Sequence, residues 1–103
     1  MMADRHTPFM FYVYMMTNKN NTVIYTGHTD DLAKRVFEHQ NHQHKGFTDR
    51  YNCEKLVWYE AHENRDDAKE RERRIKRWAR SWKVTLVQEM NPEWRDLGIV
   101  FLG

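Results

Sequence analysis

One stretch of the sequence, VIYTGHTDDLAKRVFEHQ (residues 23–40), places a tyrosine, an arginine and a histidine close to a glycine. These are Tyr25, Gly27, Arg35 and His39. Tyrosine and histidine can donate or accept a proton, and the planar guanidinium of arginine suits phosphate and carboxylate oxygens. Arg35 and His39 are four residues apart, so they share one face of a helix. Taken singly, a surface ion pair explains Arg35 equally well, and a capped or exposed imidazole explains His39.

A second tyrosine, Tyr14, lies in the preceding strand-like segment. If the hairpin has a tight turn at Lys19 and Asn20, the residue numbers of each cross-strand pair add up to 39. That register places Tyr14 opposite Tyr25, with both phenols on one face of the sheet. Gly27, two residues later, lets the backbone approach another group closely. The alternative is an ordinary cross-strand aromatic pair.

The elements that would position these residues follow from periodicity and turn signals. Aromatic and β-branched runs predict three strands, at 9–16, 23–27 and 55–62. Asp30 and Asp31 favour a helix start, and its core stripe is Leu32, Ala33, Val36 and Phe37. We expect a loop at residues 41–52. Asn64 is expected to cap a long basic helix, and we expect residues 84–90 to be helical. This order predicts one α+β domain over 1–103, with a core of about 9–90 and a tail of 91–103 that packs back on it.

A glutamate interrupts the apolar stripe of the long helix. The stripe consists of positions 68, 72, 75, 79 and 82, and all are apolar except Glu72. A carboxylate that faces the core costs free energy unless it is paired or binds a cation. Two interpretations stay open here: an internal salt bridge, with Arg35 as a candidate partner, and a cation site.

Charge and composition narrow the class of protein. The whole chain carries 17 Lys and Arg against 15 Asp and Glu, but residues 64–83 alone carry a net charge of +5. A concentrated basic helix suits a polyanion, although a solvated face with i,i+4 ion pairs gives the same pattern. Cys53 is the only cysteine, the first residues do not resemble a secretory signal, and no apolar run could span a bilayer. We therefore expect a cytoplasmic protein.

Three histidines, His39, His42 and His44, raise the alternative of a transition-metal site. No cysteine or carboxylate set accompanies them in the sequence, so the pattern favours a polar loop.

Taken together, these residues resemble the GIY-YIG nuclease family. The resemblance rests on Tyr12-Val13-Tyr14, then Tyr25-Thr26-Gly27, then Arg35 and His39, and on ERERRIKRW (70–78), which contains Glu72. MNPEWRDL (90–97) resembles the tail of small, stand-alone bacterial members. The family has glycine where this chain has Tyr12 and isoleucine where it has Thr26. The resemblance implies a three-stranded antiparallel sheet flanked by helices.

The resemblance also implies roles in phosphodiester hydrolysis. Glu72 would hold a divalent cation, Mg²⁺ or Mn²⁺, since such ions prefer oxygen ligands. Arg35 would hold the scissile phosphate, and Tyr14 would be the general base, activated by nearby positive charge. Tyr25 would orient the water or bond the phosphate, and His39 would accept a tyrosine proton or position a phenol.

The expected partner is nucleic acid, DNA rather than RNA, including structured or damaged DNA met in repair or recombination. The expected contacts are Gly27, Lys45, Arg73, Arg77 and Arg80. Larger relatives attach a separate DNA-binding domain, which these 103 residues lack. A non-catalytic nucleic-acid-binding module with the same fold is therefore the alternative.

Overall fold

The fold is an α+β arrangement in which helices flank a three-stranded antiparallel sheet of order β2-β1-β3. The computed structural model describes residues 10–98. Its elements are β1 (Phe11–Thr17), β2 (Ile24–Thr29), α1 (Leu32–Gln40), α2 (Phe47–Arg50), β3 (Lys55–His62), α3 (Arg65–Lys76) and α4 (Arg80–Met90). The three predicted strands and the fold class are confirmed. Phe9, the first residue of the first predicted strand, and residues 99–103 of the predicted tail lie outside the described residues.

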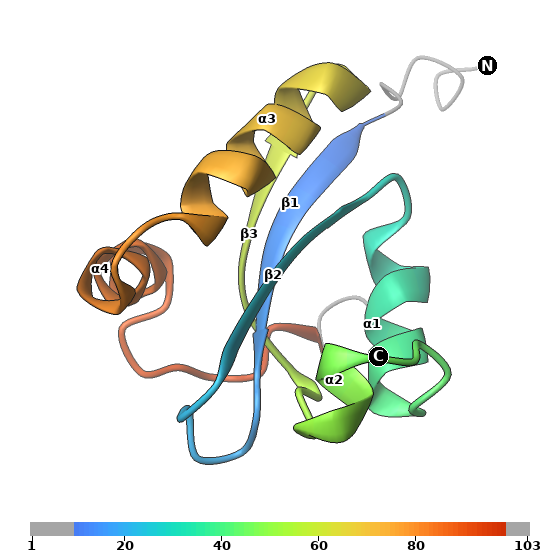
Figure 1. Ribbon diagram of the computed structural model, residues 1–103, viewed down its shortest axis with the longest axis vertical. Helices are drawn as coiled ribbons and strands as arrows, with labels where there is room; N and C mark the ends of the chain where they lie inside the picture. Colours follow the sequence, from blue (N-terminus) through green and yellow to red (C-terminus); the bar gives the residue numbers. More distant parts are fainter. Residues whose placement is uncertain (1–9, 99–103) are drawn as a thin grey trace, which may run out of the picture.

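The sheet separates two helical layers, because alternate residues of β1 point to opposite faces. Val13 and Met15 are fully buried in the core cluster that contains Ala68 and Ile75 of α3. Tyr14 and Met16 are fully buried on the other face, in a cluster with residues of α1. Figure 1 shows α3 and α4 on one side of the sheet and α1 and α2 on the other.

The register of the β1–β2 hairpin differs from the predicted one. Paired residues sum to 41 rather than 39, so Tyr14 pairs with Gly27 and Tyr25 pairs with Met16. The turn itself is present, since the Asn21 amide donates to the Asn18 carbonyl at 3.0 Å. The Asn18 side chain then accepts from the amides of residues 22 and 23, which adds two residues before β2 starts. A shift of two residues preserves the face, so both phenols still lie on the same side.

The predicted long basic helix is two helices. Asn64 caps α3 as expected, through its side chain and the Asp67 amide. The helix ends at Lys76, and the extended backbone of Ala79 starts α4 in a new direction (Figure 1). The prediction that the apolar stripe of this helix continues through positions 79 and 82 is therefore wrong. Trp82, for example, is 63% exposed.

The remaining differences are local. The predicted loop at 41–52 contains the short helix α2. Phe37, predicted in the core stripe of α1, is 48% exposed, whereas Leu32 and Val36 are buried as expected. After α4, the Asn91 side chain donates to the Val57 carbonyl at 3.1 Å and so holds the following residues against β3. Within residues 10–98, no helix has the length and apolar character needed to cross a membrane.

Candidate active site

The Tyr14 hydroxyl and the His39 imidazole form the centre of the candidate site. Tyr14 lies in β1 and His39 in the last turn of α1, and their exposed fractions are 0% and 1%. The Tyr14 hydroxyl oxygen lies 3.0 Å from His39 Nε2. The structure therefore brings together two of the residues that the sequence singles out.

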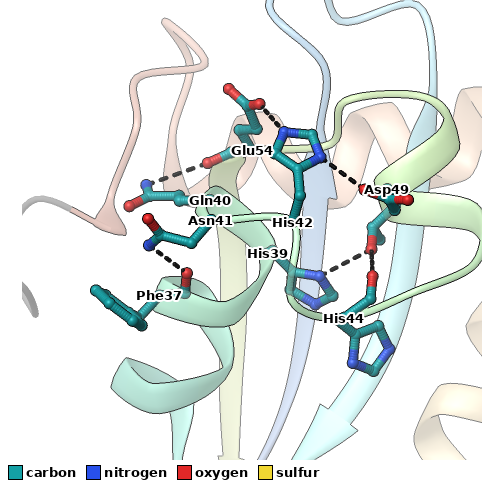
Figure 2. A network of polar contacts seen from close by, with 9 residues as sticks. Phe37, His39, Gln40, Asn41, His42, His44, Asp49 and Glu54 are labelled. Atoms are coloured by element: carbon teal, nitrogen blue, oxygen red, sulfur yellow. Dashed lines mark hydrogen bonds and ion pairs between the residues drawn. The ribbon is translucent and has the colours of Figure 1, made fainter.

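Thr48 of α2 determines which nitrogen of His39 carries the proton. The Thr48 hydroxyl donates to the His44 carbonyl oxygen at 3.4 Å, because a carbonyl can only accept. Thr48 Oγ1 then accepts from His39 Nδ1–H, at 2.9 Å. A neutral imidazole has one N–H, so Nε2 is left to accept the Tyr14 O–H. The result is a directed chain from Tyr14 through His39 and Thr48 to the His44 carbonyl. Figure 2 draws its last two bonds, the one that leaves His39 and the one that ends at His44.

Burial keeps both central groups neutral. It raises the pKa of the Tyr14 phenol far above its usual value, the nearby Tyr25 adds to this, and the Arg35 guanidinium opposes it. Burial lowers the pKa of His39 to about 4, with smaller contributions from His44 and Arg35. Positive charge near Tyr14 is present as expected, but desolvation outweighs it. Tyr14 is thus a phenol in the free protein.

Gly27 makes room for the two phenols. It is the cross-strand partner of Tyr14, and a Cβ at this position would lie 2.8 Å from the Tyr14 hydroxyl. The same atom would lie 2.9 Å from Cε2 of Tyr25, whose ring centre is 6.2 Å from that of Tyr14. The close approach expected at Gly27 is therefore an approach to these two rings. Its contact with nucleic acid remains a prediction.

Tyr25 connects this buried pair to the outer edge of the sheet. Its ring centre is 5.7 Å from that of His39 and 6.1 Å from that of Phe47, on which it stacks. Lys76 Nζ, from α3 in the opposite layer, lies 5.9 Å from the same ring centre. Side chains of both layers therefore meet around Tyr25 at the edge strand β2.

Glu72 reaches this edge from α3. Its side chain is 14% exposed, with Oε1 2.5 Å from His28 Nδ1 and Oε2 2.6 Å from Lys76 Nζ. The internal ion pair considered from the sequence is thus present with other partners, since Arg35 pairs with Glu38 at 3.2 Å. Arg35 lies in α1, on the other face of the sheet, which explains the difference.

The five predicted site residues therefore wrap around β2 and do not lie on one face. Tyr14, Tyr25, Arg35 and His39 belong to the side covered by α1, and Glu72 belongs to the side covered by α3. Glu72 is still within electrostatic reach, because its negative charge adds a small part of the rise in the Tyr14 pKa.

Glu72 offers the kind of oxygen ligand that a hard divalent cation prefers, but both of its oxygens contact basic side chains. Mg²⁺ is commonly held by one or two carboxylates, with waters and substrate phosphate oxygens completing its coordination. Glu72 supplies one carboxylate beside a half-exposed lysine. Residues 10–98 contain no group of three or more His, Cys, Asp or Glu side chains that could hold a metal by themselves.

The basic residues predicted to contact nucleic acid have different surroundings. Arg73 is paired with Glu70 at 2.6 Å, and Arg80 donates to the carbonyls of Asn21 and Thr22 in the hairpin loop. Arg77 is exposed at the end of α3. Lys45 is exposed in the segment that leads into α2. The positive charges of Arg77, Arg80 and Lys45 stay available to a polyanion.

Of the three histidines considered as a metal cluster, His39 and His44 lie with ring centres 4.7 Å apart, whereas His42 has other partners. Figure 2 shows His42 between Asp49 and Glu54, with ring nitrogens 2.9 Å and 2.5 Å from their oxygens. Hydrogen bonds to these two carboxylates raise the pKa of His42. Asp49 lies in α2 and Glu54 follows it, so His42 holds this helix in place.

Sequence reasoning missed three residues of the site. Thr48 lies in a segment predicted as loop, and His28 follows the predicted end of β2. Phe47 becomes a neighbour of Tyr25 only through the position of α2. The sequence signal for α2 is the glycine at position 46. Gly46 precedes the helix with a φ of 112°, a conformation that glycine adopts readily.

Similarity to known proteins shows the family to which the chain belongs. Residues 10–85 match the GIY-YIG catalytic domain. A UPF0213 protein of Staphylococcus saprophyticus is 32% identical over 86 residues, covering 84% of this chain and 98% of the relative. A UPF0213 protein of Clostridium perfringens is 37% identical over 78 residues, covering 76% and 83%. The solution structure of a UPF0213 protein from Bacillus halodurans superposes with a TM-score of 0.54 at 25% identity, covering 84% and 92%.

The chain therefore belongs to the GIY-YIG family, a nuclease-type family that binds nucleic acid. Within this family it is homologous to the small bacterial UPF0213 proteins. The expected resemblance is confirmed.

Proposed function

We propose that this protein is a metal-dependent endonuclease that hydrolyses phosphodiester bonds in DNA, including structured or damaged DNA, in the cytoplasm. The observation that carries the proposal is the directed chain from Tyr14 through His39 to Thr48. A merely structural buried tyrosine needs only a partner for its hydroxyl. Here the partner is a neutral base whose tautomer is fixed for accepting a proton.

The chain supports a proton path that needs no free phenolate. The Tyr14 oxygen accepts a proton from the attacking water while its own proton passes to His39 Nε2. Tyr14 ends neutral and His39 ends as an imidazolium, with Nδ1–H still bound to Thr48. The raised Tyr14 pKa agrees with a path that avoids a free phenolate. The lowered His39 pKa leaves the imidazole unprotonated before the transfer, but it also makes His39 a weak base, so the imidazolium is a short-lived product.

Two further residues would act on the phosphate. Arg35 would hold non-bridging oxygens with its guanidinium, which suits their geometry. Tyr25, at the edge of β2, would orient the water or bond the phosphate. Glu72 would hold Mg²⁺ or Mn²⁺, which supplies charge neutralisation at the developing negative oxygens.

The second candidate function is a DNA-binding module without turnover. One observation favours it: both carboxylate oxygens of Glu72 already contact a basic side chain, His28 or Lys76. A cation would have to share these oxygens or displace one of the two partners.

Purified protein incubated with plasmid, single-stranded, branched and RNA substrates would separate the two functions. The endonuclease predicts cleavage with Mg²⁺ or Mn²⁺, none with EDTA, and none by Tyr14→Phe, which keeps the ring but lacks the hydroxyl. If the unmutated protein binds DNA and cleaves no substrate with either ion, the binding module is the better description.

A further inference from the structure

A hollow of about 320 Å³ lies across the edge of β2, beside the candidate active site. Its walls come from both layers: Phe47 from α2 on one side, and Lys76 and Lys83 from α3 and α4 on the other. Tyr25 and Thr26 of β2 form its floor. None of the five predicted site residues except Tyr25 lines it, so the hollow is an addition to the site.

The aromatic wall of this hollow is exposed. Phe47 is 47% exposed, and Tyr51, one turn later, is 43% exposed with its ring centre 4.7 Å from that of Phe47. A second hollow, of about 340 Å³, is lined by Gly46, Phe47, Arg50 and Tyr51. Phe47 thus stands between two hollows and presents aromatic surface to both.

The wall is held firmly although its rings are exposed. Thr48, next to Phe47, is 1% exposed and bonded to His39. His42 holds Asp49 in the same helix (Figure 2). Exposed aromatic rings on an anchored helix are preorganised for stacking, since little side-chain freedom is lost on binding.

The opposite wall is cationic and polar. Within residues 10–98 Lys83 has no ion-pair partner, and burial together with the charges of Arg80 and Lys76 lowers its pKa. The Thr26 hydroxyl is buried and has no hydrogen-bond partner among these residues. An ammonium without an ion-pair partner beside this hollow favours an anionic ligand.

We propose that this hollow binds an unpaired nucleotide adjacent to the scissile phosphate, with the base on Phe47 and the phosphate on Lys83. Base–aromatic stacking beside a cationic groove is the usual mode of single-strand binding. A base inside a duplex has its faces covered and cannot stack on Phe47, so the preferred substrate carries single-stranded DNA at the site. Thr26 stands where the GIY-YIG pattern has isoleucine, so its hydroxyl is a feature of this chain. The inference rests on the proposed nuclease function only in placing this nucleotide next to a phosphate that is cleaved.

The test measures binding in EDTA, so that cleavage does not enter. The probe is a short single-stranded DNA carrying the fluorescent base 2-aminopurine, compared with the same sequence as a duplex. We expect the unmutated protein to quench the fluorescence of the single strand and to bind it more tightly than the duplex. Phe47→Leu should remove the quenching and weaken single-strand binding about tenfold, within the range for the loss of one stacked base.

Phe37→Leu is the matched control, because Phe37 is 48% exposed on α1 and lines neither hollow. Lys83→Gln should weaken single-strand binding and reduce its salt dependence, whereas Lys34→Gln, at an exposed position of α1 outside the basic segment, should change neither. Equal affinity and quenching for Phe47→Leu and Phe37→Leu would overturn the proposal even if the protein cleaves DNA. If the unmutated protein quenches the fluorescence but cleaves no DNA, the proposed nuclease function is refuted and the nucleotide-binding hollow is retained. Thermal melting of each variant checks that it is folded.

Discussion

The Tyr14 hydroxyl donates to His39 Nε2 over 3.0 Å, and the direction of this bond is fixed from the far side of the imidazole. Thr48 is the group that fixes it, through Nδ1. The strand β1 and the helices α1 and α2 therefore each contribute one member of a single proton path.

Replacing Thr48 by valine removes the acceptor for His39 Nδ1–H. We expect kcat for cleavage to fall roughly tenfold to a hundredfold, part of the usual contribution of a general base, with KM little changed. The unsatisfied buried N–H should also cost about 1 to 3 kcal/mol of unfolding free energy. Thr48→Ser keeps the hydroxyl and should restore kcat. A valine variant with unaltered kcat would remove Thr48 from the path.

The lowered pKa of His39 predicts acid sensitivity of the fold. The unfolded chain binds a proton near pH 6.5 and the folded chain only near pH 4, so stability is lost as the pH falls between these values. The loss assigned to His39 is about 3 kcal/mol, at roughly 1.4 kcal/mol for each pH unit. Urea unfolding of the protein and of His39→Gln at several pH values should give curves that converge towards pH 4. Parallel curves would contradict a depressed His39 pKa.

Glu72→Gln keeps the shape of the side chain and removes its charge. Cleavage supported by Mg²⁺ should fall at least about a hundredfold, the scale for loss of a main electrostatic group. Binding of DNA in EDTA should persist or tighten, since a negative charge near phosphate is gone. Stability should fall by about 1 to 2 kcal/mol because the charged bonds to His28 and Lys76 are weakened. Glu63→Gln, at an exposed position, is the control, and full cleavage by Glu72→Gln would exclude Glu72 as the metal ligand.

Gly27→Ala introduces a methyl group into the space occupied by the Tyr14 hydroxyl. Overpacking of this kind costs about 1 to 3 kcal/mol, which lowers the melting temperature of a domain of this size by about 5 °C or more. Cleavage should fall as well, because the methyl group displaces Tyr14 from His39. If the alanine variant keeps the original melting temperature and cleavage rate, the rings of Tyr14 and Tyr25 can move aside without cost, which would contradict this prediction.

The basic face should give DNA binding a salt dependence that is unequal among its arginines. Arg77→Ala should lower the slope of log affinity against log salt by up to about 0.9, the value for one neutralised phosphate. Arg73→Ala should lower it less, because Glu70 already neutralises Arg73. Titration at several salt concentrations measures both slopes. Equal slopes for the two variants and the unmutated protein would mean that this face is only solvated surface.

The fold and the proximity of Tyr14, Tyr25 and His39 were predictable because they depend on local signals. Strand propensity located β3 at its observed residues, and Asp31 and Asn64 were recognisable as helix caps. The face shared by Tyr14 and Tyr25 survived an error in register because the error was two residues, an even number.

What the sequence did not yield depends on contacts between distant segments. The end of α3 at Lys76 has no proline or glycine to mark it, and the break arises where α4 turns to pack on the sheet. The partner of Glu72 could not be identified without knowing that His28 points to the α3 side of the sheet. Thr48 carries no signal of its own, since its importance comes from α2 lying beside α1.

The position of β2 at the outside of the sheet has a consequence for association. Among residues 10–98, β2 has a strand neighbour on one side only, so its other edge presents backbone groups on which a further strand can form. The hollow and Tyr25 lie at that edge, so a strand added there by another molecule would block access for DNA. On the proposed function, pairing of a second molecule with β2 and binding of DNA at the hollow would therefore compete for the same edge.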